Sequence, residues 1–203
     1  MITRELREAL RQHDLWCSSH GGRQLVAEDL DFSGLDLSGA NLVGAELPGA
    51  DFSDAILRNA DLANGNFASA RFLATDMSGA TMSKANLDHA VFDGARLDGV
   101  NFRRASLIEA SFVRAILDRA DLGSADLESA NLTDASLVEC RLAGTIFIRT
   151  RLTGARLRGS LDAGTARTTS LVVDRLLEGD VARHWLLAAG APPLAPATML
   201  KPG

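Results

Sequence analysis

The chain has 203 residues, 46% of them hydrophobic, which is enough for one substantial core without disulfide or metal staples. Its net charge of −5 argues against a general nucleic-acid binder, which is expected to be basic. The two cysteines, Cys17 and Cys140, exclude a disulfide framework, and no metal-ligand spacing connects them to the four histidines.

The N-terminal segment alternates charged and apolar residues, so it lacks the continuous apolar region of a signal peptide. No stretch of the chain reaches the length needed to span a bilayer. These two observations predict a cytoplasmic protein that has no membrane partner.

Residues 3–12 read as a short helix that Thr3 caps, with Ile2, Leu6, Ala9 and Leu10 on one apolar face. Leu15 and Trp16 are expected to continue from this helix towards the core. Gly21 and Gly22 then mark the entry to the first coil, and residues 1–29 are predicted to form an N-terminal helical cap and lead-in.

A five-residue repeat follows. From Phe32 to Leu157 every fifth residue is Leu, Phe or Met, which gives 26 consecutive positions with no insertion. From position 40 onward the residue two places earlier is Ala or a small substitute such as Thr75, and Val100 is the largest exception. The residue between these two is commonly Asp or Asn.

Neither regular backbone fits this period. A five-residue step rotates by about 140° around an α-helix, which would spread the large residues over all sides. On a straight strand an odd step reverses the face, so successive large residues would point in opposite directions. A chain that turns a corner every five residues keeps every large residue inside, and pairs such as "SG", "NG" and "DG" suit the corners.

The phenylalanines indicate how many sides such a coil has. Five of them are spaced by 20 residues, which corresponds to four sides of five residues each. Stacked coils would place these rings above one another at roughly the 4.8 Å spacing of neighbouring strands. The predicted aromatic core ladder comprises Phe32, Phe52, Phe72, Phe92 and Phe112.

The pattern of "SADLE", "SANLT", "SGANL" and "GADFS" resembles that of the pentapeptide repeat proteins. The resemblance covers residues 30–160 and implies an all-β solenoid, a right-handed quadrilateral β-helix with four pentapeptides per coil. About 26 repeats then make 6–7 coils, with short α-helical segments at both ends.

The repeat ends near Ser160. Residues 161–190 read as two short helices, the first running from Ser170 to Gly179 and the second from Asp180 to Gly190. They form either a plain lid or a lid that is also a homodimer interface, because their apolar surface exceeds what a lid needs. The candidate interface comprises Val173, Leu176, Leu177, Val181 and Trp185, and residues 191–203 are expected to be a flexible, proline-rich tail.

We find no motif for catalysis: no nucleophile elbow, no HExxH and no phosphate-binding glycine loop. The many Asp and Asn residues belong to the repeat, where they are expected to bind nearby backbone. His89 is interpreted as an exposed turn residue and Cys140 as a small core residue. The sequence therefore predicts a protein that is not an enzyme, with no catalytic residue, metal, cofactor or small-molecule substrate.

The charged residues are distributed unevenly along the repeats. Residues 28–98 carry twelve acidic and four basic residues, a net charge of −8, whereas residues 141–160 carry five arginines and no acid. This asymmetry is either incidental or a means of steering the rod towards a partner with a basic groove. The candidate acidic surface comprises Asp31, Asp36, Asp51, Asp54, Asp76, Asp93 and Asp98.

Two functions remain open. Some pentapeptide repeat proteins protect DNA gyrase from topoisomerase poisons, as acidic rod-shaped dimers that mimic a DNA duplex, and the resemblance implies this function here. The uninterrupted repeat leaves no projecting loops of the kind found in plasmid quinolone-resistance members, so the rod surface would have to act alone. The alternative is a generic rigid scaffold that binds another protein and has no topoisomerase role.

Overall fold

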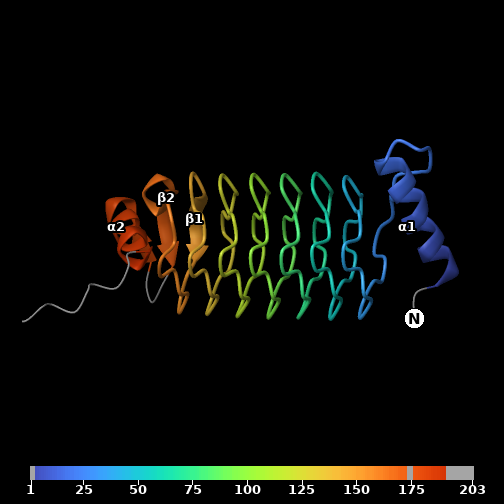
Figure 1. The fold of residues 1–203 in the computed structure, drawn as a ribbon. Coiled ribbons are helices and arrows are strands. Elements are labelled where there is room, and N and C mark those ends of the chain that lie inside the picture. Colours follow the sequence, from blue (N-terminus) through green and yellow to red (C-terminus); the bar gives the residue numbers. More distant parts are fainter. Residues whose placement is uncertain (1–2, 173–175, 191–203) are drawn as a thin grey trace, which may run out of the picture.

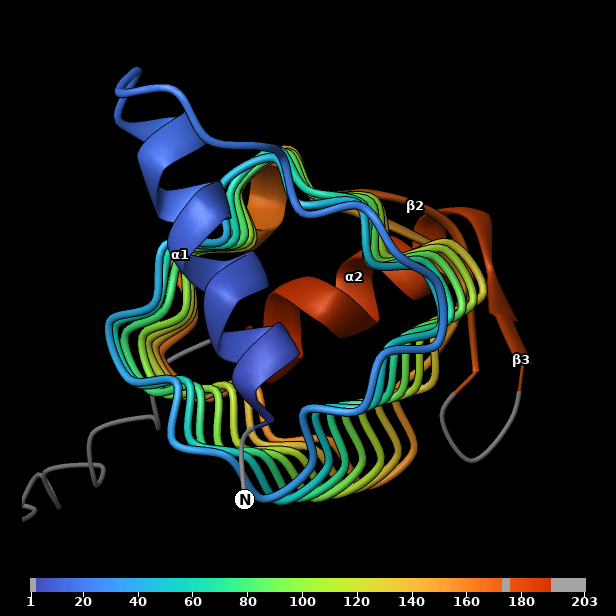
Figure 2. The same ribbon diagram turned by 90° about the vertical axis from the view of Figure 1, so that its right-hand side faces the viewer.

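A computed structural model describes residues 3–172 and 176–190, and in it the five-residue repeat becomes a stack of four-sided coils (Figure 1). Isolated parallel bridges join residues 20 positions apart, from Val26 and Glu46 to Arg141 and Leu161. Figure 2 shows the four-sided outline along the axis of the rod. The predicted coil of 20 residues is confirmed, while its right-handed sense and the total of 26 repeats stay predictions.

Backbone hydrogen bonds run between coils rather than within a repeat. The amide of Phe32 donates to the carbonyl oxygen of Asp51 at 2.7 Å, and the amide of Asp51 donates to that of Leu30 at 2.8 Å. Only the corner is local, where the amide of Leu35 donates to the carbonyl oxygen of Phe32 at 3.2 Å. One repeat therefore cannot satisfy its own backbone, and the fold depends on stacking.

The last residue of each repeat has a positive φ, which turns the corner. Gly34 takes this conformation with φ +62°, but so do Lys84 and Glu109 with φ +59° and +58°. In the "NG" pair Asn64 turns the corner with φ +58°, and Gly65 lies at the small core position two places before Phe67, as the repeat predicts. A Cβ atom on Gly65 would approach the Phe67 ring to 2.4 Å.

The core is a column of Leu, Phe and Met side chains, and the predicted aromatic ladder is confirmed. Ring centroids of Phe32 and Phe52 lie 4.6 Å apart, and those of Phe72 and Phe92 lie 4.8 Å apart. The stacked rings are parallel within 3–4°. Successive coils are thus nearly superimposed along this side.

Several small core positions hold a hydroxyl or thiol instead of alanine. Each of these side chains is buried and donates to a carbonyl oxygen 23 residues earlier, such as Thr75 to Phe52 at 2.7 Å and Thr145 to Leu122 at 2.8 Å. A polar group is therefore tolerated at this position, because the preceding coil provides its acceptor. The same bond is made by Cys140, Thr150 and Ser160.

Helix α1, Arg4–Cys17, lies across the N-terminal end of the rod (Figure 2). Thr3 caps it as predicted, since its hydroxyl accepts from the amide of Leu6 at 3.1 Å. The helix runs five residues beyond the predicted end at residue 12, and the expectation that Trp16 continues into the core is wrong, because 41% of this residue is exposed. The chain then returns at Gly22, where a Cβ atom would lie 2.2 Å from the carbonyl oxygen of Gln12.

The C-terminal end consists of strands and one helix. Strand β1 is Ile146–Arg151, a short 3-10 helix is Ala163–Thr165, β2 is Arg167–Val172, β3 is Leu176–Glu178 and α2 is Gly179–Gly190. The predicted helix from Ser170 to Gly179 is wrong, because β2 pairs in parallel with β1 and β3 pairs antiparallel with β2. Pairing with the open edge of the last coil overrides the local pattern.

Helix α2 confirms the second predicted helix and lies at the opposite end of the rod from α1 (Figure 1). Leu186 is buried, and Trp185 is half-buried against the core. These contacts close the C-terminal end, as the prediction of a lid requires. The predicted flexible tail lies outside the described residues.

Candidate interaction surfaces

The coil presents four flat sides, each a stack of repeats 20 residues apart. We define side 1 by the central residues Phe32, Phe52 and their successors, side 2 by Leu37 and its successors, side 3 by Leu42 and side 4 by Leu47. In each repeat the first outward position lies before the central residue, and two more follow it. A residue's place in the repeat therefore fixes the side on which it lies.

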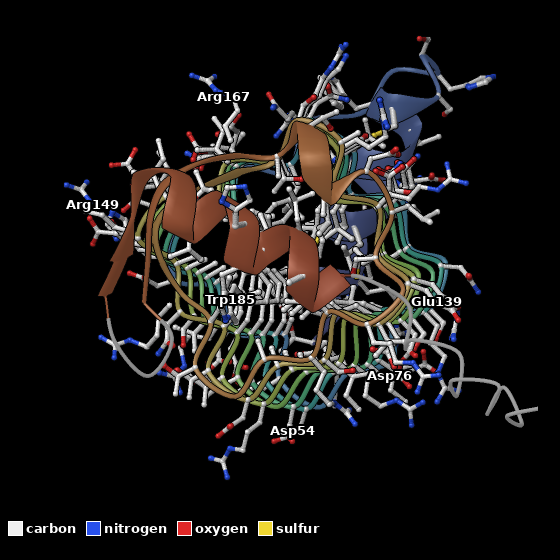
Figure 3. All side chains as sticks on the ribbon, turned by 90° about the vertical axis from the view of Figure 1, so that its left-hand side faces the viewer. Asp54, Asp76, Glu139, Arg149, Arg167 and Trp185 are labelled. Carbon is white, nitrogen blue, oxygen red and sulfur yellow. The ribbon has the colours of Figure 1, made fainter. Side chains whose placement is uncertain are left out.

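The candidate acidic surface occupies two neighbouring sides. Asp31, Asp51, Asp54 and Asp93 lie on side 1, and Asp36, Asp76 and Asp98 lie on side 2. Figure 3 looks along the rod from its C-terminal end and shows Asp54 and Asp76 pointing outward around one part of the perimeter. The structure thus brings the seven predicted residues onto one half of the rod surface.

Three of the seven carboxylates are paired with arginines of the same surface. Arg71 lies 3.5 Å from Asp51, Arg58 lies 2.7 Å from Asp76, and Arg119 lies 3.3 Å from Asp98. The sequence did not reveal this pairing, because the partners are 18–21 residues apart and meet only when the coils stack. The other four residues, Asp31, Asp36, Asp54 and Asp93, form no ion pair with any described residue.

Hydrogen bonds lower the pKa of three of these carboxylates, those of Asp31, Asp36 and Asp76. The hydroxyl and amide of Ser33 lower the pKa of Asp31, and those of Ser38 lower the pKa of Asp36 in the same way. For Asp76, partial burial opposes ionisation, but hydrogen bonds from Arg58 and Ser78 outweigh it and lower the pKa. The predicted role of the repeat Asp, binding nearby backbone, is confirmed, for instance by the amide of Gly123 donating to Asp121 at 2.9 Å.

The basic last coil surrounds the rod instead of occupying one side. Arg141 lies on side 3, Arg149 on side 4 and Arg151 on side 1, whereas Arg156 and Arg158 lie on side 2. Arg149 donates to Glu128. The two side 2 arginines line a groove of about 750 Å³ between the last coil and α2, whose other lining residues are Val138, Glu139, Ala155, Leu157, Gly159 and Ala189.

Four of the five candidate dimer residues, Leu176, Leu177, Val181 and Trp185, lie at this same end. Val173 lies outside the described residues, as do the side chains of Leu176, Leu177 and Val181. Trp185 packs against the core, so its ring closes the rod. Two other large apolar residues are exposed here, Leu161 at 54% and Leu187 at 39%.

The described residues contain no group of three or more His, Cys, Asp or Glu side chains that could hold a metal ion. Burial raises the pKa of Cys140 to about 12, so this thiol is not a nucleophile. His89 is exposed at a corner with φ +61° and lies 3.5 Å from Glu109, as its interpretation as a turn residue requires. Among the described residues, no helix is long and apolar enough to cross a membrane.

Sequence reasoning missed a side-chain cluster beneath α1. The buried His13 accepts from the amide of Leu25 at Nδ1, 2.9 Å away, and its Nε2 lies 3.5 Å from the Cys17 sulfur. The Cys17 thiol donates to the carbonyl oxygen of Val43 at 3.5 Å, and the Trp16 ring stacks on His13. The spacing of His13 from Trp16 and Cys17, three and four residues along a helix, was the available signal.

The fold is a repeat solenoid: its coils stack, its Asp and Asn side chains bind nearby backbone, and its phenylalanines form a ladder. A family profile described as "Pentapeptide repeats" matches residues 31–67, 55–94, 85–123 and 125–161. These matches span more than half of the chain, so it belongs to the pentapeptide repeat family. No curated protein sequence matches the chain significantly.

Several solved structures are similar. HetL of the cyanobacterium Nostoc sp. strain PCC 7120, described as involved in regulating heterocyst differentiation, is 23% identical with a TM-score of 0.45, over 76% of this chain and 75% of HetL. A protein of the Arabidopsis thaliana thylakoid lumen is 30% identical with a TM-score of 0.40, over 53% of this chain and 68% of its own. A trypsin-treated variant of QnrB1, described as a plasmid-mediated fluoroquinolone resistance protein, is 23% identical with a TM-score of 0.34, over 74% and 89%.

Proposed function

We propose that the protein is a non-enzymatic, rod-shaped binding protein whose acidic half docks in the basic groove of a DNA-binding enzyme. The most concrete partner is DNA gyrase, which the rod would occupy as a DNA mimic and protect from topoisomerase poisons. The proposal draws on the resemblance of the repeats to the gyrase-protecting members of the family. It requires no bound nucleic acid, cofactor or small-molecule substrate.

The observation that carries the proposal is the density of acidic charge along the rod. Residues 28–98 have a net charge of −8 and span about three and a half coils, which is roughly 17 Å at the spacing of neighbouring strands. This amounts to one negative charge per about 2 Å, close to the value of about 1.7 Å for duplex DNA. A groove built for DNA would meet a comparable field.

The first test measures the effect of the protein on the activity of gyrase. Purified protein should inhibit supercoiling by gyrase and reduce quinolone-dependent cleavage complexes at micromolar concentration. An affinity pull-down from a bacterial lysate should retain the gyrase subunits. If neither activity changes at these concentrations, the gyrase proposal is wrong, and a protein-binding scaffold without a topoisomerase role replaces it.

A matched pair of variants tests whether the unpaired carboxylates make the contact. Asp31→Asn with Asp54→Asn removes two carboxylates that have no ion-pair partner, and Asp76→Asn with Asp98→Asn removes two that are paired. Both double variants raise the net charge by two. We expect the first to weaken inhibition of supercoiling at least about tenfold more than the second, and equal effects would show that only total charge matters.

We also propose that the protein is a homodimer joined through its C-terminal segment. The support is the exposure of Leu161 and Leu187 at an end where α2 already closes the core. Dimerisation at this end would place the two acidic halves at the far ends of a longer rod. It would also cover part of the basic last coil, which weakens mimicry of DNA when exposed.

A further inference from the structure

A hollow of about 400 Å³ lies where the end of α1 meets side 3 of the first coils. Trp16 and Cys17 line it from the helix, and Asn41, Val43 and Asp61 line it from the coils. Its described lining contains no lysine or arginine. The hollow is therefore a separate feature from the groove at the C-terminal end, which two arginines line.

Trp16 gives this hollow an exposed aromatic wall. The residue is 41% exposed, although its ring is held in place by stacking on the buried His13, with centroids 5.5 Å apart and planes inclined by 20°. A lid has no need of an indole that is held in place but exposed to solvent, whereas such a side chain is suited to binding a partner. Tryptophan is enriched at the energetic centres of interfaces, and its face is the best side-chain platform for a cation.

The charge around the hollow is negative. Asp61 accepts from the amide of Ala63 at 3.0 Å through Oδ1 alone, and Asn41 donates to Asp14 on α1 at 3.3 Å. Neither the carboxylate of Asp61 nor that of Asp14 forms an ion pair with a described residue. Asp61 therefore keeps one carboxylate oxygen, Oδ2, for a ligand.

Helix α1 adds to this field. Its C-terminal end lies at the hollow, and its last turn contains no basic residue to compensate the negative pole of the helix dipole. Burial raises the pKa of Cys17, and the negative charges of Asp14 and Asp61 raise it further, as expected if both carboxylates lie close to the hollow.

We infer that this hollow binds the guanidinium group of one arginine side chain from a protein partner. A guanidinium is planar and remains charged, so it can stack on the indole of Trp16 while donating hydrogen bonds to Asp61. An ammonium has no flat face to stack. The inference rests on the proposed docking of the rod against a basic protein, and it supplies a specific anchor where charge density alone would give only attraction.

The test uses the full-length protein and a blocked tripeptide, acetyl-Gly-Arg-Gly-amide. Proton–nitrogen NMR spectra show one indole signal for each of the two tryptophans, and Trp185→Phe identifies that of Trp16. We expect the arginine peptide to shift the Trp16 signal saturably at millimolar concentration and to leave the Trp185 signal in place. A citrulline peptide, which has the same shape without the charge, should cause no shift.

Asp61→Asn should weaken this binding at least about tenfold without unfolding the rod, because asparagine occupies the same repeat position at Asn41 and also accepts an amide there. The matched control is Asp126→Asn, whose carboxylate accepts the equivalent amide of Glu128 far from the hollow. Equal shifts with the two peptides, or equal binding by Asp61→Asn and Asp126→Asn, would overturn the inference. Failure of the supercoiling assay with intact arginine binding contradicts only the gyrase proposal.

Discussion

At the scale of single residues, His13 joins the N-terminal helix to the first coil by a specific protonation state. Its Nδ1 accepts the amide of Leu25 at 2.9 Å, so in the neutral ring the proton lies on Nε2, which faces the Cys17 sulfur at 3.5 Å. Burial lowers the pKa of His13, and hydrogen bonding to the Val43 backbone and the charge of nearby Asp14 only partly oppose this. A proton added at Nδ1 would face the Leu25 amide, a donor.

The pH dependence of stability follows from this lowered pKa. The unfolded chain protonates His13 at an ordinary pKa near 6.5, before the folded protein does, so the free energy of unfolding should fall as the pH drops below that value. We expect a loss of about 1 kcal/mol between pH 7.5 and 5.5 in urea unfolding. His13→Gln should flatten this slope, and an unchanged slope in this variant would contradict the assignment to His13.

The buried hydroxyls also lend themselves to a test. Thr145→Val keeps the shape of the side chain but removes the donor to the Leu122 carbonyl oxygen, at 2.8 Å in a fully buried site. We expect a loss of about 1–2 kcal/mol in the free energy of unfolding, measured by urea denaturation. Thr81→Val, at a half-buried outward position, should change it by less than about 0.5 kcal/mol. Similar values for the two variants would contradict the assigned role of the hydroxyl.

At the scale of elements, the aromatic ladder couples successive coils of side 1. Phe72 stacks on Phe52 at 4.9 Å and on Phe92 at 4.8 Å, with Phe67 edge-on at 6.4 Å. Offset or stacked aromatic pairs contribute beyond the area that they bury. The ladder should therefore stabilise the middle coils more than the same number of leucines would.

Phe72→Leu measures that contribution, because leucine is the usual residue at central positions of the repeat and fits the core there. Phe147 is equally buried but stacks on no other aromatic ring among the described residues, which makes Phe147→Leu the control. Calorimetry should show Phe72→Leu to be more destabilising than Phe147→Leu by about 1–2 kcal/mol. Equal destabilisation would mean that only burial counts.

At the scale of the whole molecule, the rod is polarised from an acidic N-terminal half to a basic last coil. Both ends are closed, by α1 and by α2 with β2 and β3 (Figure 1). Lids of this kind protect the open edges of a solenoid. The exposed apolar surface at the C-terminal end, which Leu161 and Leu187 provide, is therefore more than closing the rod requires.

Light scattering tests the dimer that this surplus supports. We expect a mass of twice the 21.5 kDa of the chain. Leu161→Ser with Leu187→Ser should shift the mass towards that of a monomer, since the apolar surface that is buried drives association. Ile116→Ser changes a comparably exposed residue in the middle of side 2 and should leave the mass unchanged. A monomer at high protein concentration would refute the interface.

Much of the fold could be predicted from the sequence, because in a solenoid each position repeats the same environment. The period of Phe32 and its successors placed the ladder, and the small residue two positions earlier predicted the tight core. The candidate acidic residues were also predicted, together with their restriction to the first half of the rod. Their pairing with Arg58, Arg71 and Arg119 could not be predicted without the stacking of residues 18–21 positions apart.

The sequence by itself therefore determined the five-residue period, the buried column and the charge asymmetry, since each depends on a pattern repeated along the chain. Only the tertiary structure decided what happens at the two ends, where no repeat fixes the environment. The segment from Ser170 became strand because the last coil offered unpaired backbone, and Trp16 remained exposed because His13 anchors α1 in place of its ring. Contacts between distant residues override local propensity wherever a backbone edge or a buried polar group must find its partner.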